Sequence, residues 1–224
     1  MIKSSPDPYS ELKELIEGNT QKELKCRKYL CYVPHILFKE FVTDIIYSDK
    51  EYRTFSGDSD YVISGIVKEE SGISYPKAYI WELKAPQCFI FKRERGGRLS
   101  PTSDLFEAEN QLLNYYHDIL GQQSFLDTYR VAPQNVQAGG IIIGCNKTTV
   151  KGKFEELKRD ELYEKAIKIR QYFYKSMGIR LLTWDYVLAN IESVKHDGET
   201  KESLEIRPIS TSRLPIGTLR KFGW

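Results

Sequence analysis

The chain has 224 residues, of which 41% are hydrophobic and 12% aromatic, enough to bury one core and too apolar for a wholly disordered chain. Its formal net charge of +2 excludes a polycation that binds nucleic acid through bulk charge. No run of about 18 apolar residues occurs, and the first residues lack the apolar segment of a secretory signal. We therefore expect a cytoplasmic protein with no membrane partner.

The cysteines and histidines are too scattered for a disulfide framework or a zinc site. No CxxC pair is present, and the three histidines lie far apart in the sequence. The sequence therefore predicts reduced, buried thiols at all four cysteines, which are Cys26, Cys31, Cys88 and Cys145.

Two helices are predicted at the start of the chain. The first spans residues 8–18 and has Ser10 as its candidate N-cap. The second starts with Asn19 or Thr20 as its cap and runs to Val33, because the proline that follows disfavours a further helical residue.

Three strands are predicted next, at residues 37–47, 60–67 and 78–84. The last two form an antiparallel hairpin about a turn at Ser71 and the following glycine. Paired residue numbers then sum to about 142 or 143, which places Asp60 opposite Glu82 or its neighbour.

The stretch AYIWELKAPQ, residues 78–87, ends its strand with two charges. Side chains alternate along a strand, so Glu82 and Lys84 share one face while Trp81 and Leu83 point to the other, into the core. Such a pair is usually a solvated ion pair that contributes little energy, so we expect these charges to face outward.

A basic loop at residues 92–98 precedes a helix that begins within 100–104 and ends at Leu120. The helix has an apolar stripe with the spacing of a core-facing side. The stripe consists of Leu105, Ala108, Leu112, Tyr116 and Ile119, and the polar strip beside it of Glu107, Gln111 and Tyr115.

Residues 139–144, GGIIIG, read as a buried central strand. A phosphate-binding loop is excluded because neither GxGxxG nor GxxxxGK[ST] is present. A helix at 154–177, a strand at 179–183 and a helix at 184–191 complete a mixed α/β domain. The domain spans residues 1–192, with a helical part at 1–34, and a basic C-terminal extension covers residues 193–224.

An aspartate and a glutamate on neighbouring strands supply hard oxygen ligands of the kind that Mg²⁺ or Mn²⁺ prefers. The predicted ligands are Asp60, Glu82 and the backbone carbonyl of Leu83. A lysine beside the cation, here Lys84, can orient an attacking water and stabilise charge on a phosphate. These residue types suit phosphodiester hydrolysis.

The order of Asp60, then Glu82-Leu-Lys84, then a helix with Gln111 and Tyr115 at QxxxY spacing resembles the PD-(D/E)XK nuclease superfamily. Within it the chain is most similar to the catalytic domain of the Shedu anti-phage defence nucleases. The segments that carry this likeness are DYVI, WELKAP, AENQLLNYY, GGIIIGCN and IRLLTWDYVLANI, and the likeness covers roughly residues 20–192.

The resemblance implies a restriction-endonuclease-like core, a central mixed sheet flanked by helices. It implies metal binding by Asp60 and Glu82, activation of water by Lys84, and a site shaped by Gln111 and Tyr115, all five counted as catalytic. The family's Pro-Asp is Ser-Asp here, so a second aspartate, Asp58, is an alternative ligand, and Glu23 is a candidate additional carboxylate.

The expected activity is a metal-dependent DNA endonuclease or nickase in anti-phage defence, acting on double-stranded DNA. Phosphate contacts are expected from Lys92, Arg93, Arg95 and Arg98 and from the basic C-terminal segment. Homo-oligomers and an activating partner remain open. So do two alternatives, a binding or assembly module of the same fold without catalysis of its own, and an RNA-directed or repair nuclease.

Overall fold

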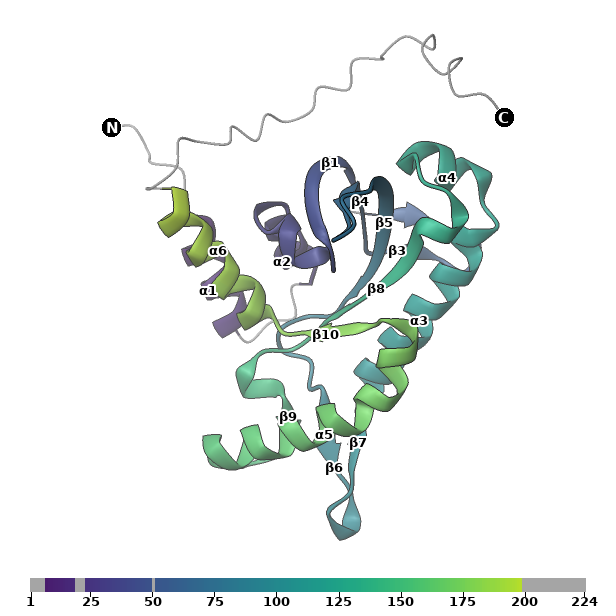
Figure 1. The fold of residues 1–224 in the computed structure, drawn as a ribbon. Helices are drawn as coiled ribbons and strands as arrows, with labels where there is room; N and C mark the ends of the chain where they lie inside the picture. Colours follow the sequence, from purple (N-terminus) through teal and green to yellow (C-terminus); the bar gives the residue numbers. More distant parts are fainter. Residues whose placement is uncertain (1–6, 19–22, 50, 199–224) are drawn as a thin grey trace, which may run out of the picture.

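The computed structural model describes residues 7–18, 23–49 and 51–198, which form a mixed α/β fold around one central sheet (Figure 1). The sheet has five strands in the order β1-β4-β5-β8-β10. The first three are antiparallel neighbours, and β8 and β10 continue the sheet in parallel with β5. Their bounds are β1 (Phe41–Asp49), β4 (Tyr61–Lys68), β5 (Ser74–Leu83), β8 (Val136–Ile142) and β10 (Arg180–Leu182).

Helices cover both faces of this sheet, as predicted (Figure 1). Buried residues of α3 (Ser103–Leu120), α4 (Gln123–Tyr129) and α5 (Glu156–Met177) share one hydrophobic cluster with the sheet. Residues of α1 (Pro8–Glu17), α2 (Glu23–Arg27) and α6 (Trp184–Gly198) belong to the opposite cluster. Within the described ranges, no helix combines the length and the apolar character needed to cross a membrane.

Strand β5 lies at the centre of the sheet and contributes to both clusters. Ile80 packs on the α3 side, whereas Trp81 and Leu83 pack on the α6 side. The predicted alternation is therefore confirmed, because consecutive side chains of a strand point to opposite faces.

The register of β4 on β5 is the predicted one. Tyr61 pairs with Trp81 and Val62 with Ile80, so Asp60, the residue before β4, reaches the level of Glu82. The connecting turn closes when Gly72 N–H donates to the Glu69 carbonyl at 2.9 Å. Gly72 has φ +86°, a conformation that glycine adopts without strain.

The N-terminal segment differs from the prediction. Asp7, and not Ser10, caps α1, since its Oδ2 accepts from the Ser10 N–H at 3.3 Å. The predicted second helix is the short α2 followed by two 3₁₀ turns, η1 (Lys28–Tyr32) and η2 (Pro34–Leu37). Its proposed caps, Asn19 and Thr20, lie outside the described residues.

Residues 37–40 do not belong to the first strand, which begins at Phe41 and not at Leu37. Arg180 on β10 donates to the carbonyls of Ile36, Leu37 and Phe38 at 2.7–3.0 Å. These bonds tie the end of η2 to β10, a long-range effect that local sequence does not indicate.

Several short elements were not predicted. The basic loop is a β hairpin, β6 (Phe91–Arg93) and β7 (Leu99–Pro101), with the 3₁₀ turn η3 (Arg95–Gly97) at its tip, and it projects from the body (Figure 1). β6 also pairs with β9 (Val150–Lys151). The remaining short elements are β2 (Tyr52–Arg53), β3 (Asp58–Ser59), η4 (Pro133–Asn135) and η5 (Asn146–Thr148).

The glycines of the GGIIIG segment explain its place in the sheet. A Cβ on Gly139 would lie 2.5 Å from Trp81 Nε1, and one on Gly140 would lie 2.2 Å from the Arg180 carbonyl oxygen. The glycines therefore allow a large indole to pack on a buried strand, and the predicted buried strand is confirmed.

Two other sequence predictions are wrong. Helix α6 continues to Gly198, whereas the predicted helix ends at residue 191, and residues 199–224 lie outside the described part. All four cysteines are free, as predicted, but Cys31 is exposed whereas the other three are buried.

Candidate functional site

Glu82 and Lys84 lie at the carboxyl end of β5, beneath α3. The Glu82 side chain is 2% exposed, and its Oε1 lies 3.2 Å from Lys84 Nζ. Lys84 Nζ also donates to Gln111 Oε1 at 2.6 Å and lies 3.5 Å from Glu107 Oε1. The alternative of a solvated surface pair is therefore wrong, because both side chains are largely buried and Lys84 contacts Gln111 of α3.

Asp60 completes the cluster from the start of β4. Its Oδ2 accepts the Leu83 backbone N–H at 2.8 Å, in the position where the ladder of β4 would have continued. The N–H and C=O of a strand residue point to the same edge, so the Leu83 carbonyl faces the Asp60 side of β5. The predicted third oxygen thus lies on the edge of β5 that Asp60 contacts.

Asp58, the alternative aspartate, is exposed and lies on β3, where it pairs with Arg53. Asp60 is the aspartate that hydrogen-bonds the end of β5. Asp58 thus lies on the short strand β3, whereas Asp60 precedes β4 and contacts β5. This geometry favours Asp60 as the candidate metal ligand.

The two carboxyl groups have raised pKa values. Burial, and then the charge of Asp60, raises the pKa of Glu82 to about 9, although Lys84 opposes the shift. Burial also raises the pKa of Asp60, against the Leu83 N–H and the charges of Lys84 and Arg27. Near neutral pH and without a metal, this shift favours the protonated form of Glu82, and a bound cation would displace that proton.

Lys84 and Glu23 also have pKa values that the charges of this cluster shift. Burial lowers the pKa of Lys84, but its contacts with Glu82 and the nearby charge of Glu23 outweigh this, so the pKa is raised. Burial, and then Asp60, raises the pKa of Glu23 on α2 to about 7. The additional carboxylate suggested by the sequence thus lies near enough to Asp60 to sense its charge.

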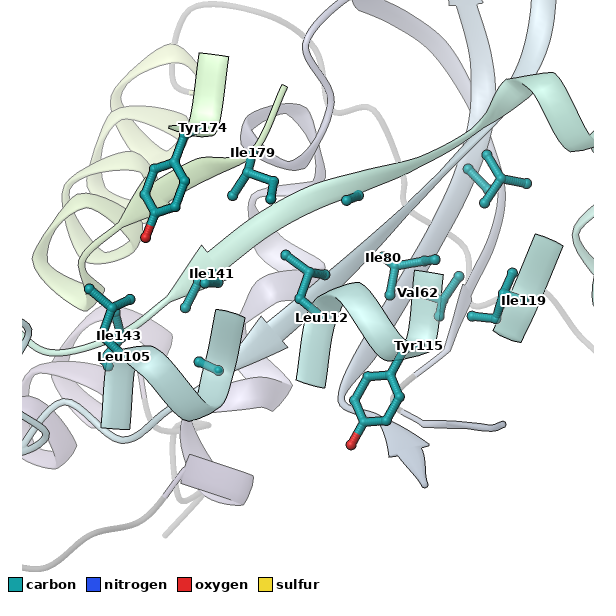
Figure 2. Packing of buried hydrophobic residues seen from close by; sticks show 14 of the residues in the cluster. Val62, Ile80, Leu105, Leu112, Tyr115, Ile119, Ile141, Ile143, Tyr174 and Ile179 are labelled. Carbon is teal, nitrogen blue, oxygen red and sulfur yellow. The ribbon is translucent and has the colours of Figure 1, made fainter. Parts of the chain in front are cut away.

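Gln111 and Tyr115 occupy different environments on α3. Gln111 is half-buried and binds Lys84, whereas Tyr115 is 6% exposed and belongs to the same cluster as Val62 and Ile80 (Figure 2). Tyr115, not Tyr116, therefore continues the fully buried stripe. Burial, and then the charges of Glu82 and Asp60, raises its pKa to about 12.

A cavity of about 550 Å³ opens between α2 and the first turns of α3, at the end of β5. Its wall includes Glu23, Lys84, Asp104 and Glu107. Glu107 and Asp104 were not predicted as site residues. The interval of four residues between Glu107 and Gln111 is the sequence signal that could have identified Glu107, since such residues lie on one side of a helix.

The arrangement suits a small hard cation with few protein ligands. Glu82 Oε2 is buried, and no hydrogen-bond donor reaches it in the described part of the chain. Within residues 7–18, 23–49 and 51–198, no three or more His, Cys, Asp or Glu side chains form a metal-binding group. Two carboxylates and a carbonyl are few ligands, a number that suits Mg²⁺ because this ion keeps several of its waters.

The basic residues of the β6–β7 hairpin lie outside this cluster. Lys92, Arg93, Arg95 and Arg98 are all exposed. Lys92 forms an ion pair with Glu94 at 2.9 Å, so the positive charge of the hairpin is partly compensated.

No protein-family model matches this sequence, and no curated protein compared with it matches. Evidence for a function therefore comes from the site itself.

Proposed function

We propose that this protein is a metal-dependent endonuclease or nickase that hydrolyses phosphodiester bonds in DNA. In this proposal residues 1–192 form one PD-(D/E)XK nuclease domain. The observation that carries it is the approach of Lys84 Nζ to Glu82, on a strand end that Asp60 hydrogen-bonds and that Gln111 contacts from α3. Two acidic side chains beside a lysine are the equipment for phosphodiester hydrolysis. A purely structural Glu–Lys pair needs neither the second acid, Asp60, nor an oxygen without a donor, as Glu82 Oε2 is in the described residues.

Asp60, Glu82 and the Leu83 carbonyl would hold the divalent cation, Mg²⁺ or Mn²⁺. When bound, that ion supplies Lewis acidity toward the phosphodiester. The ammonium group of Lys84 donates hydrogen bonds to the attacking water or to a phosphate oxygen as negative charge develops there. Gln111 fixes the Lys84 side chain at 2.6 Å, so the lysine is already oriented before substrate arrives.

DNA binding is assigned to the exposed β6–β7 hairpin. Its four cations, Lys92, Arg93, Arg95 and Arg98, contact phosphates, which makes binding fall with rising salt concentration. A role in anti-phage defence in the cytoplasm, in the manner of the Shedu nucleases, rests on the sequence resemblance, as do oligomeric assembly and activation by a partner.

A binding or assembly module without catalysis is the second candidate. It is favoured by the absence, in the described ranges, of a group of three or more metal-ligating side chains. An RNA-directed or repair nuclease would use the same residues, so only the substrate distinguishes it.

The deciding experiment compares wild type with Lys84→Met and Lys77→Met on plasmid, linear duplex, single-stranded DNA and RNA, with Mg²⁺, Mn²⁺ or a chelator. Lys77 is a matched control because it is also a buried lysine paired with a glutamate. It lies near the start of β5, its side chain is 8% exposed, and it binds Glu40. We expect metal-dependent cleavage that Lys84→Met reduces at least about hundredfold and Lys77→Met leaves unchanged. Circular dichroism would verify that both variants are folded.

Each outcome has a consequence for the proposal. Equal cleavage by wild type and folded Lys84→Met would exclude the catalytic assignment. DNA binding without cleavage under any metal condition would favour the binding module. Cleavage restricted to RNA would retain the site and change the substrate.

A further inference from the structure

The outward side of α5 carries large apolar residues with no partner in the described part of the chain. The inward side of this helix contributes Ala166 and Tyr174 to the core, and Arg170 on that side binds Glu109 of α3. On the outward side, Leu157 is 81% exposed and Tyr172 is 86% exposed. A helix that buries one side on its own domain needs no such residues on the other.

These residues belong to one continuous stripe. An open groove of about 800 Å³ runs along this side and is lined by α5 alone, including Leu157, Glu161, Lys168 and Tyr172. From Leu157 to Tyr172 the stripe extends about 22 Å along the helix. Its residues recur at intervals of three and four, which places them on one side of the helix.

The order of chemical types along this stripe is self-complementary. From its N-terminal end it reads Leu157, Asp160, Glu161 and Glu164, then Lys165, Lys168, Ile169 and Tyr172. The midpoint between positions 164 and 165 divides it into one apolar residue followed by three acids, and two bases followed by two apolar residues. All pairs about that midpoint except Asp160 with Ile169 are complementary.

We infer that the outward side of α5 is the interface of a twofold-symmetric dimer, in which a second copy packs its own α5 antiparallel to the first. The axis passes between Glu164 and Lys165. In that register Glu164 faces Lys165 of the partner, Glu161 faces Lys168, and Leu157 faces Tyr172. Each contact occurs twice, as an isologous interface requires.

The order of charges along α5 favours a second copy of this chain as the partner and an antiparallel packing of the two helices. A parallel pairing in register would set Glu161 and Glu164 against their own copies, and the lysines likewise, which is repulsive. Glu161 already forms a surface ion pair with Lys158 at 2.8 Å, but both partners are exposed, so exchanging this contact costs little. Asp160 and Ile169 also line the groove and face each other in this register, the one mismatched position.

The test uses the full chain and is independent of nuclease activity. Sedimentation velocity over a wide concentration range should show a monomer–dimer equilibrium for wild type. Glu164→Lys and Lys165→Glu should each raise the dimer dissociation constant at least about tenfold, because like charges then meet twice. The double exchange should restore dimerisation, and an equimolar mixture of the two single variants should form mixed dimers.

The charge-matched control is Glu70→Lys in the exposed turn between β4 and β5, which should dimerise as wild type does. Circular dichroism would confirm that all variants are folded. A wild-type monomer at every concentration would overturn the inference and leave this side to a different partner. A dimer that neither single exchange weakens, or that the double exchange does not restore, would overturn it as well.

Discussion

Two lysine–glutamate contacts lie near the two ends of strand β5. They differ in how many of the glutamate oxygens accept hydrogen bonds. Near its start, Glu40 accepts from Lys77 Nζ at 2.5 Å and from the Tyr79 hydroxyl at 2.6 Å, so both carboxylate oxygens are bonded. Burial alone would raise the pKa of Glu40, but its bonds to Lys77 and Tyr79 lower it. This group remains ionised and acts as a structural clamp.

At the end of the same strand, Glu82 is more deeply buried, and its Oε2 has no donor in the described ranges. Its pKa is raised to about 9, and a second carboxyl group, Asp60, lies beside it. The same pair of residue types therefore serves stability at one end. At the other end it leaves a buried acid that takes up a proton, or would bind a cation in its place.

The largest expected difference between the two ends is in cleavage. Asp60→Asn should reduce metal-dependent DNA cleavage at least about hundredfold, because a neutral amide is a weak ligand for a hard cation. Glu40→Gln should leave the rate within about twofold. Initial rates at saturating DNA would measure this, with gel-shift binding to confirm that both variants still bind DNA. Comparable rate losses in the two variants would contradict the distinction.

The next effect is on folding. Glu40→Gln should lower the free energy of unfolding by about 2 kcal/mol, since it leaves Lys77 buried without its counter-charge. Glu82→Gln should not lower it and should raise it near neutral pH, because folding of wild type must add a proton to Glu82 that the amide does not need. Urea denaturation would measure both variants. A larger loss for Glu82→Gln would show that Glu82 is the structural member.

A smaller effect concerns pH. Between the ordinary value of 4.5 and about 9, folded Glu82 carries a proton that the unfolded chain has released. Raising the pH therefore favours unfolding, and this stabilising contribution is complete below about 4.5 and lost above about 9. Between pH 7 and 8, metal-free wild type should lose about 1 kcal/mol more stability than Glu82→Gln. Parallel pH profiles for the two proteins would refute the shift.

An effect of similar size is stabilisation by metal. Mg²⁺ at ten times its dissociation constant should stabilise wild type by about 1.4 kcal/mol, and Glu40→Gln equally. Glu82→Gln and Asp60→Asn should show little increase in melting temperature. Calcium offers a useful control, since it tests oxygen ligation without depending on catalysis. Equal shifts in all four proteins would place the metal elsewhere.

Local pattern predicted the parts of this molecule that depend on neighbouring residues. The β4–β5 register followed from a short turn, and the alternation in AYIWELK followed from the pleat of a strand. Together they predict Asp60 beside Glu82, and the register of β4 on β5 agrees. The likeness to a nuclease family supplied roles for these residues, and those roles remain proposals.

Features that depend on distant residues were missed. The 37-residue separation between Glu40 and Lys77 gives no local signal, and neither does Arg180, which holds three carbonyls more than 140 residues away. The sequence predicts Tyr115 in the polar strip and Tyr116 in the apolar stripe. Two adjacent tyrosines have the same hydrophobicity, so the sequence does not show which one is buried. Only the fit of α3 against the sheet decides which of them is fully buried.

Trp184 donates its indole N–H to the Lys84 carbonyl at 2.7 Å and is fully buried. The strand end that carries the candidate site is thus coupled directly to a fluorophore. A change in the position or charge of that peptide alters the hydrogen bond and the field at the indole, and so its emission. The molecule contains an intrinsic optical reporter one peptide away from its proposed chemistry, readable without a label.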